Sequence, residues 1–416
     1  MQNVTIELEI ERLAGSGDGV GRGPDGRVVF VPLSAPGDRV RVALVEQHER
    51  FRRGRIEALL RPGPERSEPR CAVFGECGGC SWQHLSYPAQ LAAKRAILAD
   101  ALRRIGRIEL PELPEVEPSP QAYGYRGRSR VIARGGRVGF RRRASHELCA
   151  VEACPVLEPE LESALQQLAR SRPADGEWEL ARGARGAHSV RLPIPSAARA
   201  VPGAPERRSE WRIAGEVLRT SPGVFTQSNP ALCEALVRAV HEACGRGSLV
   251  LDAFCGAGLF SLGLARRFER VIALESNAAA IADLRANLAA AGLANVEVVE
   301  QRFEHWLEAG AGAANAIEVA VVDPPRAGLP DASASRLAER VGRRLIYVSC
   351  DPATLARDLA RILACGFELV SLRGFDLFPQ TPHIEAVAVL ERAAGRAGRG
   401  PSGAGAQGST MPLRTA

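Results

Sequence analysis

The sequence predicts an α/β protein, with a doubly wound parallel sheet in its C-terminal part, a small β-barrel at its N-terminus and a mixed region in between. Three observations support this prediction. Short apolar segments alternate with helical stretches after about residue 216, as in successive βα units. Closely spaced apolar alternations, broken by glycine-rich turns, occupy the first 60 residues. Cysteines and arginines are concentrated in the region between these two parts.

The length and composition fit a globular protein of several domains. The chain has 416 residues, which at about 100 to 200 residues per domain is enough for two or three. Hydrophobic residues make up 45% and charged residues 25%, and no run approaches the ~18 apolar residues of a membrane span. The first residues lack the basic and apolar pattern of a secretory signal. We therefore expect a cytoplasmic protein with no membrane partner.

Residues 1–60 have the pattern of a small barrel. Apolar residues alternate over 4–10, 28–31 and 40–44, with a glycine-rich stretch from Gly15 to Gly26. This pattern predicts a five-stranded, OB-like barrel. It resembles a TRAM domain, and the resemblance implies RNA binding. Four arginines of the segment would suit RNA phosphates: Arg50, Arg52, Arg53 and Arg55.

The central domain is expected over residues 61–215. Helical spacing of Leu91, Leu98, Leu102 and Ile105 predicts a helix over 88–105, which could pack on the C-terminal domain. A second helix is expected over 159–170.

An acid-free basic stretch lies between Tyr123 and His146 of this domain. It contains Arg126, Arg128, Arg130, Arg134, Arg137, Arg141, Arg142 and Arg143. Such a local positive field suits a polyanion, and the alternative is a solvated arginine-rich face. Tyr123, Tyr125 and Phe140 could stack on RNA bases or pack in a core. The net charge is only +6, and Lys94 is the only lysine.

The C-terminal domain is expected over residues 216–394, with a disordered tail over 395–416. Asn229 and Pro230 form a helix start signal. Two late strands without an intervening helix predict a hairpin that closes the edge of the sheet. The strand candidates are residues 249–254, 271–275, 296–299, 319–323 and 345–349, followed by 368–372 and 384–390.

A glycine loop follows the first of these strands. Gly256 and Gly258 let backbone approach a ligand at the carboxyl edge of the sheet, and Glu275 ends the next strand, where it could bind ribose hydroxyls. Ser261 stands where a dinucleotide-binding fingerprint requires a third glycine. The D-x-F-C-G-x-G sequence from Asp252 resembles the S-adenosylmethionine site of class I (Rossmann-like) methyltransferases.

A T-P-H-I-E sequence near the C-terminus ends at Glu385. Three further motifs accompany it: D-P-P-R-x-G from Asp323, Y-V-S-C-x-P-x-T-x-x-R-D from Tyr347 and F-x-Q-x-N from Phe225. Together they resemble the RNA uracil-C5 methyltransferase family over nearly the whole chain. Uracil C5 is a poor nucleophile, so this chemistry needs a thiolate that adds to C6 and a base that removes the C5 proton.

Cys350 fits the nucleophile, and the resemblance assigns Glu385 as the base. It also implies that S-adenosylmethionine contacts four side chains around the Gly256 and Gly258 loop: Gln227, Phe254, Glu275 and Asp323. Leu259 and Phe303 depart from one branch of the family, which has asparagines there, and these departures put the cofactor affinity in question.

Three cysteines, Cys71, Cys77 and Cys80, lie within ten residues, and Cys154 follows in a Cys-Pro context. Four thiolates can hold zinc or a [4Fe-4S] cluster, and spacing alone does not distinguish them. The C-x5-C-G-G-C sequence with a remote Cys-Pro resembles the ribosomal-RNA branch of the family, which implies [4Fe-4S]. Cys149 is the alternative fourth ligand.

The sequence therefore predicts a monomeric methyltransferase that makes 5-methyluridine in RNA, with 23S ribosomal RNA as the first candidate substrate and transfer RNA as the second. The target base must leave any stacked structure to reach Cys350. Two rivals stay open: a catalytically silent RNA-binding protein on this scaffold, and an iron-sulfur redox protein that binds a dinucleotide.

Overall fold

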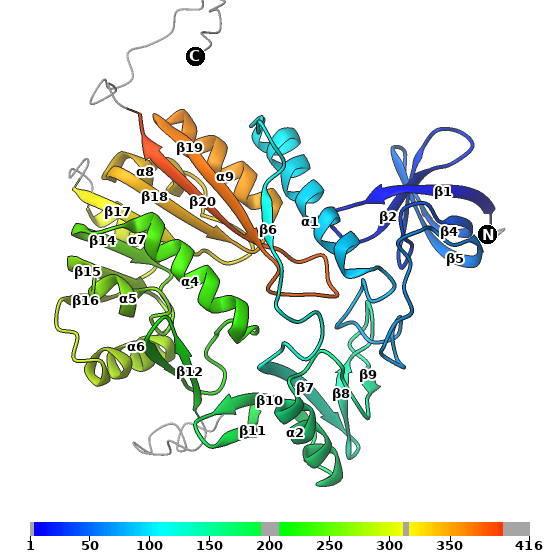
Figure 1. Cartoon of the computed structure of the whole chain (residues 1–416), viewed down its shortest axis with the longest axis horizontal. Coiled ribbons are helices and arrows are strands. Elements are labelled where there is room, and N and C mark those ends of the chain that lie inside the picture. Colours follow the sequence, from blue (N-terminus) through cyan, green and yellow to red (C-terminus); the bar gives the residue numbers. More distant parts are fainter. Residues whose placement is uncertain (1–3, 193–207, 311–315, 394–416) are drawn as a thin grey trace, which may run out of the picture.

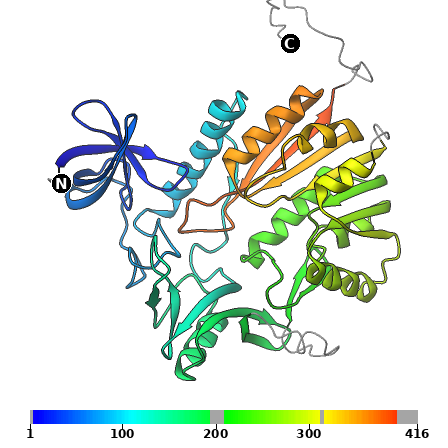
Figure 2. The same cartoon turned by 180° about the vertical axis from the view of Figure 1, so that it is seen from behind.

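The computed structural model describes residues 4–192, 208–310 and 316–393. Figure 1 shows the N-terminal barrel and the C-terminal α/β layers at opposite ends, with the central sheet between and below them. Seen from behind in Figure 2, the first helix lies between the barrel and the α/β layers. Within the described ranges, no helix is long and apolar enough to cross a membrane.

The N-terminal unit is a closed five-stranded barrel, as the sequence predicts. Its strands follow the order β1-β2-β3-β5-β4. Alternate residues such as Leu8, Ile10, Val29 and Val40 fill the interior and are almost completely buried, because successive side chains of a strand point to opposite faces. The strands are β1 (Thr5–Leu13), β2 (Gly19–Arg22), β3 (Val28–Val31), β4 (Arg39–Gln47) and β5 (Phe51–Arg61).

The central sheet has the order β13-β12-β10-β7-β8-β9, and β11 pairs with β10. Helix α2 (Pro159–Arg170) covers it with the buried Leu161 and Leu165, which confirms the predicted second helix. The strands are β7 (Arg128–Arg134), β8 (Arg137–Arg141), β9 (Leu148–Ala150), β10 (Gly176–Gly183), β11 (Gly186–Leu192), β12 (Ser209–Ile213) and β13 (Glu216–Thr220).

The C-terminal sheet has the order β16-β15-β14-β17-β18-β20-β19-β6. Its first five strands are parallel, which confirms the doubly wound α/β prediction. The strands are β6 (Glu115–Glu117), β14 (Gly247–Ala253), β15 (Phe268–Glu275), β16 (Val296–Glu300), β17 (Ile317–Val322), β18 (Val341–Ser349), β19 (Phe367–Phe375) and β20 (Glu385–Arg392). Its helices are α4 (Pro230–Cys244), α5 (Ser261–Ala265), α6 (Ala278–Ala290), α7 (Phe303–Ala309), α8 (Ser333–Arg340) and α9 (Pro352–Ala364).

The late strands β19 and β20 pair antiparallel, as predicted, but they do not form the edge of the sheet. Strand β20 inserts between β18 and β19, and β6 from the central part of the sequence pairs with β19 to become the outermost strand. Conversely, β13 belongs to the central sheet. The sequence intervals of the central and C-terminal domains therefore interleave in space. The tail over 395–416 lies outside the described residues.

Side-chain caps explain where three helices begin. Asn229, Asn277 and Asp351 each accept hydrogen bonds from backbone N–H groups in the first turn of α4, α6 and α9, which would otherwise lack partners. Proline at the first position of α4 and α9 has no N–H to satisfy. The predicted start at Asn229 is confirmed.

The helix predicted over 88–105 is α1 (Tyr87–Ala101), continued by a π-helical turn η1 (Leu102–Gly106). Leu98 and Leu102 are buried in the main core of the C-terminal domain, where α1 and η1 pack on α9. Ile105 was predicted on the same apolar face but is 49% exposed. The wider turn of a π-helix shifts later residues around the axis, so the regular helical spacing fails there.

Lys94 of α1 is fully buried. It forms an ion pair with the equally buried Asp376 in the loop between β19 and β20, and it donates to the carbonyl of Phe378 at 3.1 Å. One turn away, Gln90 and Gln380 exchange two hydrogen bonds of 2.9 and 2.8 Å. These contacts fasten the loop that precedes Glu385 to the N-terminal part of the chain.

We predict that Lys94→Met lowers the free energy of unfolding by about 3–5 kcal/mol, because the carboxylate of Asp376 stays buried without a partner. Urea unfolding followed by circular dichroism measures this change. The exposed pair of Arg103 with Asp100 provides a control, and Arg103→Met should cost less than about 1 kcal/mol. The double variant Lys94→Met/Asp376→Leu should recover most of the loss; a double variant as unstable as Lys94→Met contradicts the prediction.

Candidate active site

Sheet register brings the predicted catalytic residues together. Strands β17 and β18 run parallel with Val322 opposite Tyr347, so Asp323 and Cys350 follow their strands at the same edge. Strand β20 is antiparallel to β18 and pairs Ala386 with Ser349, which places Glu385 beside Cys350. Ligands of open α/β sheets bind at this edge. The predicted nucleophile and base are therefore neighbours, although 35 positions separate them in sequence.

The local charges disfavour a free thiolate at Cys350. Burial, followed by the neighbouring Glu385 and Asp323, raises its pKa to about 11, whereas Arg326 acts in the opposite direction. A thiolate is the reactive form of cysteine. The thiol of Cys350 is consequently protonated at neutral pH in the free protein, and a bound substrate or a neighbouring base must help to remove the proton.

Glu385 is 2% exposed. Burial and the nearby Asp323 raise its pKa well above the ordinary value, and Arg326 opposes that shift. The half-buried Asp323 itself has a pKa raised to about 7 by desolvation. Two carboxyl groups in one desolvated place resist carrying two negative charges. The pair can therefore hold a proton near neutral pH, as a group that exchanges protons with a substrate must do.

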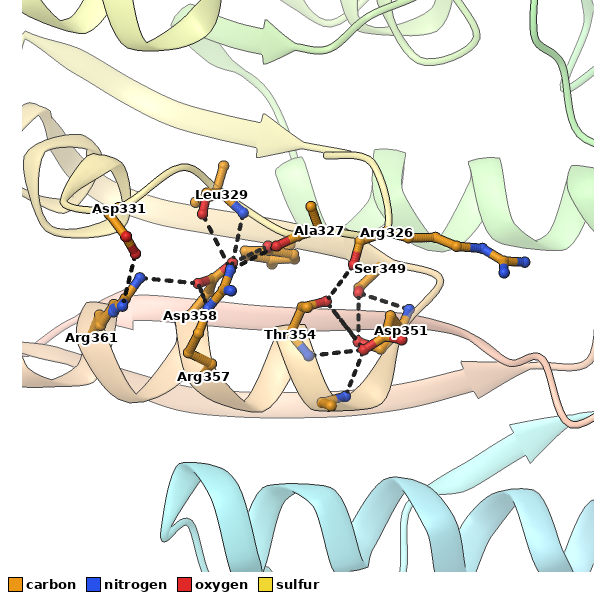
Figure 3. Close-up of polar contacts among 12 residues, drawn as sticks. Arg326, Ala327, Leu329, Asp331, Ser349, Asp351, Thr354, Arg357, Asp358 and Arg361 are labelled. Atoms are coloured by element: carbon orange, nitrogen blue, oxygen red, sulfur yellow. Dashed lines mark hydrogen bonds and ion pairs between the residues drawn. The ribbon is translucent and has the colours of Figure 1, made fainter. Parts of the chain in front are cut away.

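The two motif loops are tied together behind this site, as Figure 3 shows. The buried carboxylate of Asp358 accepts hydrogen bonds from the hydroxyl of Tyr347 at 2.7 Å and from the backbone N–H of Leu329 at 2.8 Å. Thr354 donates to the carbonyl of Arg326 at 3.2 Å, and the side chain of Arg326 points away from this network (Figure 3). The threonine and aspartate of the motif thus fix the backbone around Cys350 and Arg326.

Arg326 and His383 form a second polar contact, with 3.3 Å between Nη2 and Nε2. Burial and the charge of Arg326 lower the pKa of His383 to about 4, so the imidazole is neutral at pH 7. Both residues belong to the motifs described above, which predicted no role for either of them. Their position in two separate motifs was the available signal, and only the folded chain brings them together.

The glycine loop has the backbone shape expected of a ligand site. Phe254, Gly256 and Gly258 all adopt positive φ, at 63°, 56° and 100°. At Gly258 a Cβ would also lie 2.7 Å from Leu284, so a larger residue fits poorly there. Phe254 is the only non-glycine of the three, and strained backbone at such a residue is typical of functional sites.

Two of the predicted cofactor side chains, Glu275 and Gln227, have features that suit a polar ligand. Glu275 ends β15 and accepts a hydrogen bond from the N–H of Gly256 at 3.1 Å. Gln227 is 3% exposed, and its Oε1 has no hydrogen-bond partner within the described structure. A buried acceptor without a partner is costly, so this atom is suited to bind a polar ligand. Phe225, two positions earlier, is 75% exposed despite its apolar ring. Its place in the F-x-Q-x-N motif did not predict this exposure.

The two departures from the family pattern are apolar packing residues here. Phe303 is 3% exposed, and its ring lies 4.9 Å from the ring of Phe254. Leu259 packs beside two clusters of the core. Phe303 thus packs against the predicted cofactor residue Phe254, and Leu259 packs on the core; both side chains have a packing role in place of a polar contact.

Four cysteines line one apolar pocket in the central unit: Cys71, Cys77, Cys80 and Cys154. Burial, together with neighbouring thiols, raises the pKa values of Cys77, Cys80 and Cys154 to about 11. Cys149 lies in the hydrophobic core behind the pocket and does not line it. Among the described residues, no three His, Cys, Asp or Glu side chains form a group that could hold one metal ion as they stand.

Ion pairs neutralise part of the positive charge of the arginine stretch, although the stretch itself contains no acid. Acids from distant segments pair with four of its members: Arg128 with Glu179, Arg141 with Glu177, Arg142 with Glu76 and Arg143 with Asp18. Tyr125 is 4% exposed and donates to the carbonyl of Pro379, so core packing explains it and base stacking does not. The guanidinium of Arg70 lies over the ring of Tyr123 at 4.4 Å.

Comparison with known proteins identifies the family. Residues 212–393 match the tRNA (uracil-5-)-methyltransferase model, and residues 1–56 match the TRAM domain. The 23S rRNA (uracil(1939)-C(5))-methyltransferase RlmD of Pseudomonas putida is 34% identical over 92% of this chain and 93% of its own. The chain belongs to the RNA uracil-C5 methyltransferase family. The RlmD protein of Edwardsiella ictaluri is likewise 34% identical, over 91% of this chain and 94% of its own.

A solved structure of the family is similar over the whole fold. The Pyrococcus abyssi tRNA (uracil-54, C5)-methyltransferase, in complex with S-adenosyl-L-homocysteine, superimposes with a TM-score of 0.71 at 27% identity, covering 92% of this chain and 100% of that one. The protein is thus an S-adenosylmethionine-dependent RNA uracil-5-methyltransferase. The family resemblance predicted from the motifs is confirmed. Membership of this enzyme family argues against both alternatives, the catalytically silent RNA-binding protein and the iron-sulfur redox protein.

We predict that alkylation of Cys350 by iodoacetamide speeds up about tenfold per pH unit between pH 7 and 10, because its pKa lies near 11 and only the thiolate reacts. Mass spectrometry of the peptide that contains Cys350 gives the rate. Glu385→Gln should lower the pKa of Cys350 and speed the reaction several-fold, since it removes a neighbouring negative charge. The fully buried Cys233 serves as an unreactive control. If Glu385→Gln slows the alkylation, or if the alkylation rate does not change with pH, the raised pKa of Cys350 and its cause are contradicted.

Proposed function

We propose that the enzyme methylates C5 of a specific uridine in 23S ribosomal RNA, with Cys350 as the nucleophile and Glu385 as the base. The observation that carries the mechanism is the register of β18 and β20, which sets Cys350 beside a desolvated pair of carboxyl groups. The ribosomal substrate is supported by the curated RlmD relatives, which match along most of the chain. The Pyrococcus abyssi relative acts on transfer RNA, and transfer RNA is therefore the second candidate.

The reaction proceeds through addition of the thiolate, transfer of the methyl group and elimination of the thiolate. The thiolate of Cys350 adds to C6 of uracil and turns the ring into an enolate with a nucleophilic C5. S-adenosylmethionine supplies the methyl group, which C5 takes from the sulfonium as the S–CH₃ bond breaks. Glu385 then removes the proton from C5, the electrons of the C5–H bond form the C5=C6 double bond, and the C6–S bond breaks to release Cys350 as the thiolate. Arg326, which faces both residues, supplies positive charge where the enolate develops.

The chain also offers residues to hold the methyl donor. The backbone around Gly256 and Gly258 allows close approach, Glu275 suits ribose hydroxyls and the unpaired Oε1 of Gln227 suits a polar group. Asp323 completes the set at the end of β17.

The decisive experiment is transfer of labelled methyl from S-adenosylmethionine to unmodified 23S ribosomal RNA and, separately, to bulk transfer RNA. We expect 5-methyluridine in the ribosomal RNA. Label in transfer RNA alone overturns the ribosomal assignment.

Cys350→Ala should abolish turnover without loss of RNA binding, and Glu385→Gln should accumulate a covalent RNA adduct that survives denaturing electrophoresis. Cys365→Ala, a cysteine of the same domain outside this site, serves as the control; a fully active Cys350→Ala enzyme contradicts the mechanism.

We further propose that Cys71, Cys77, Cys80 and Cys154 hold a [4Fe-4S] cluster. Four thiols that line one pocket are the donor set of such a cluster. The same four sulfurs could hold a single zinc ion, and the resemblance of the C-x5-C-G-G-C sequence to the ribosomal-RNA branch of the family favours the cluster. A structural role is the simpler hypothesis, since methyl transfer by this route moves no net electrons.

The protein purified without oxygen should contain about four iron and four sulfide per chain. Cys80→Ser and Cys154→Ser should each lose the iron, because a ligand is removed. Cys149→Ser should keep it, since that side chain lies in the core behind the pocket. Iron and sulfide analysis tests these expectations. Zinc in place of iron, or iron that depends on Cys149 and not on Cys154, contradicts the proposed ligand set.

A further inference from the structure

The central unit contains an open hollow of about 510 Å³ beside the cysteine pocket. It lies between the β7–β8 hairpin and the Gly78–Gly79 turn, and its size is within the range of small-ligand sites. No aspartate or glutamate in the described part of the chain lines it. The lining residues that matter here are Arg126, Ser129, Arg130, Phe140, Arg141 and Arg142.

Two arginines of the hollow carry charge that the protein does not neutralise. Arg141 and Arg142 are held in place by Glu177 and Glu76. For Arg126 and Arg130, by contrast, no ion pair is found within the described ranges; their contacts are to the carbonyls of Arg128 and Gly223. Unpaired guanidinium groups in a recess attract a phosphate, which they can bind through two parallel hydrogen bonds.

The hollow also has features that a phosphate alone would not use. Phe140 is half-buried and lines both this hollow and the cysteine pocket, and nucleic-acid bases stack on aromatic rings. Ser129 is 3% exposed, yet its hydroxyl has no hydrogen-bond partner in the described structure. A buried hydroxyl without a partner costs free energy, so a ligand with polar edges would compensate it. The combination of charge, ring and hydroxyl matches a nucleotide.

The position of the hollow relates it to the active site. Arg130 donates to the carbonyl of Gly223 at 3.4 Å, two residues before the exposed Phe225. The charge of Arg126 contributes to the lowered pKa of His383 beside Arg326. A strand of RNA that enters the active site past Phe225 can therefore continue into the hollow.

We propose that this hollow is a second nucleotide subsite, which binds one unpaired nucleotide of the substrate RNA away from the methylated uridine. Its phosphate lies between Arg126 and Arg130, and its base stacks on Phe140. The proposal rests on the proposed action of the enzyme on RNA. It adds a binding step that anchors the RNA by a nucleotide that is not methylated.

Binding, measured apart from methylation, tests the subsite. The protein is the anaerobically purified Cys350→Ala full chain, and the probes are a ten-nucleotide single strand of uridines and a ten-unit abasic ribose-phosphate strand, in fluorescence anisotropy at fixed salt. We expect Arg130→Ala to weaken binding of the uridine strand about tenfold. Arg137→Ala removes the same charge from the same hairpin outside the hollow, and it should weaken binding less than about twofold.

Phe140→Leu keeps an apolar side chain against the cysteine pocket and removes the stacking ring. It should reduce the preference for uridines over the abasic strand several-fold, with an unchanged thermal unfolding midpoint. Equal effects of Arg130→Ala and Arg137→Ala would show uniform electrostatic attraction and overturn the subsite. An unchanged preference in Phe140→Leu would reduce it to a phosphate contact and overturn the nucleotide assignment. Because these experiments measure RNA binding and no methyl transfer, their results can be interpreted even if the proposed reaction is wrong.

Discussion

Lys94 and Asp376 form a fully buried ion pair that joins α1 to the loop between β19 and β20. The loop has no regular structure of its own between these strands, so contacts with other segments hold its shape. Backbone N–H groups of Ser81 and Trp82 donate to the carbonyl of Gln380, and the hydroxyl of Tyr125 donates to Pro379. The segment next to the proposed cluster ligand Cys80 and the loop that leads to Glu385 are thus parts of one hydrogen-bonded assembly.

The contacts around this loop extend beyond the central unit. The β-barrel reaches the same loop, because Trp82 donates to the carbonyl of Gly17 at 2.9 Å and a Cβ at Gly17 would lie 2.9 Å from Pro382. All three units therefore meet at one loop, and its last residue before β20 precedes Glu385 directly.

Electrostatics at the sheet edge fits a reaction in which protons move. Desolvation raises the pKa values of Cys350, Asp323 and Glu385, and Arg326 offsets part of the rise at Cys350 and Glu385. A group whose pKa lies close to the working pH can both take up and release a proton. The same cationic side chain stands beside the neutral His383, so the site presents one fixed positive charge among groups whose charge varies.

The sequence by itself determined the α/β class, the barrel and the main strands, because apolar periodicity and glycine turns act locally. It also predicted Cys350 as the nucleophile, since a motif keeps residue types at fixed spacing. Only the tertiary structure decided what depends on long-range pairing: the insertion of β20 beside β18, which brings Glu385 to Cys350, and the addition of β6 at the edge. It likewise decided that acids from remote segments pair with Arg128 and Arg141, whereas Arg126 and Arg130 have no such ion pair within the described ranges. Charge and apolar pattern can be read along the chain, whereas their partners are chosen by packing between segments far apart in sequence.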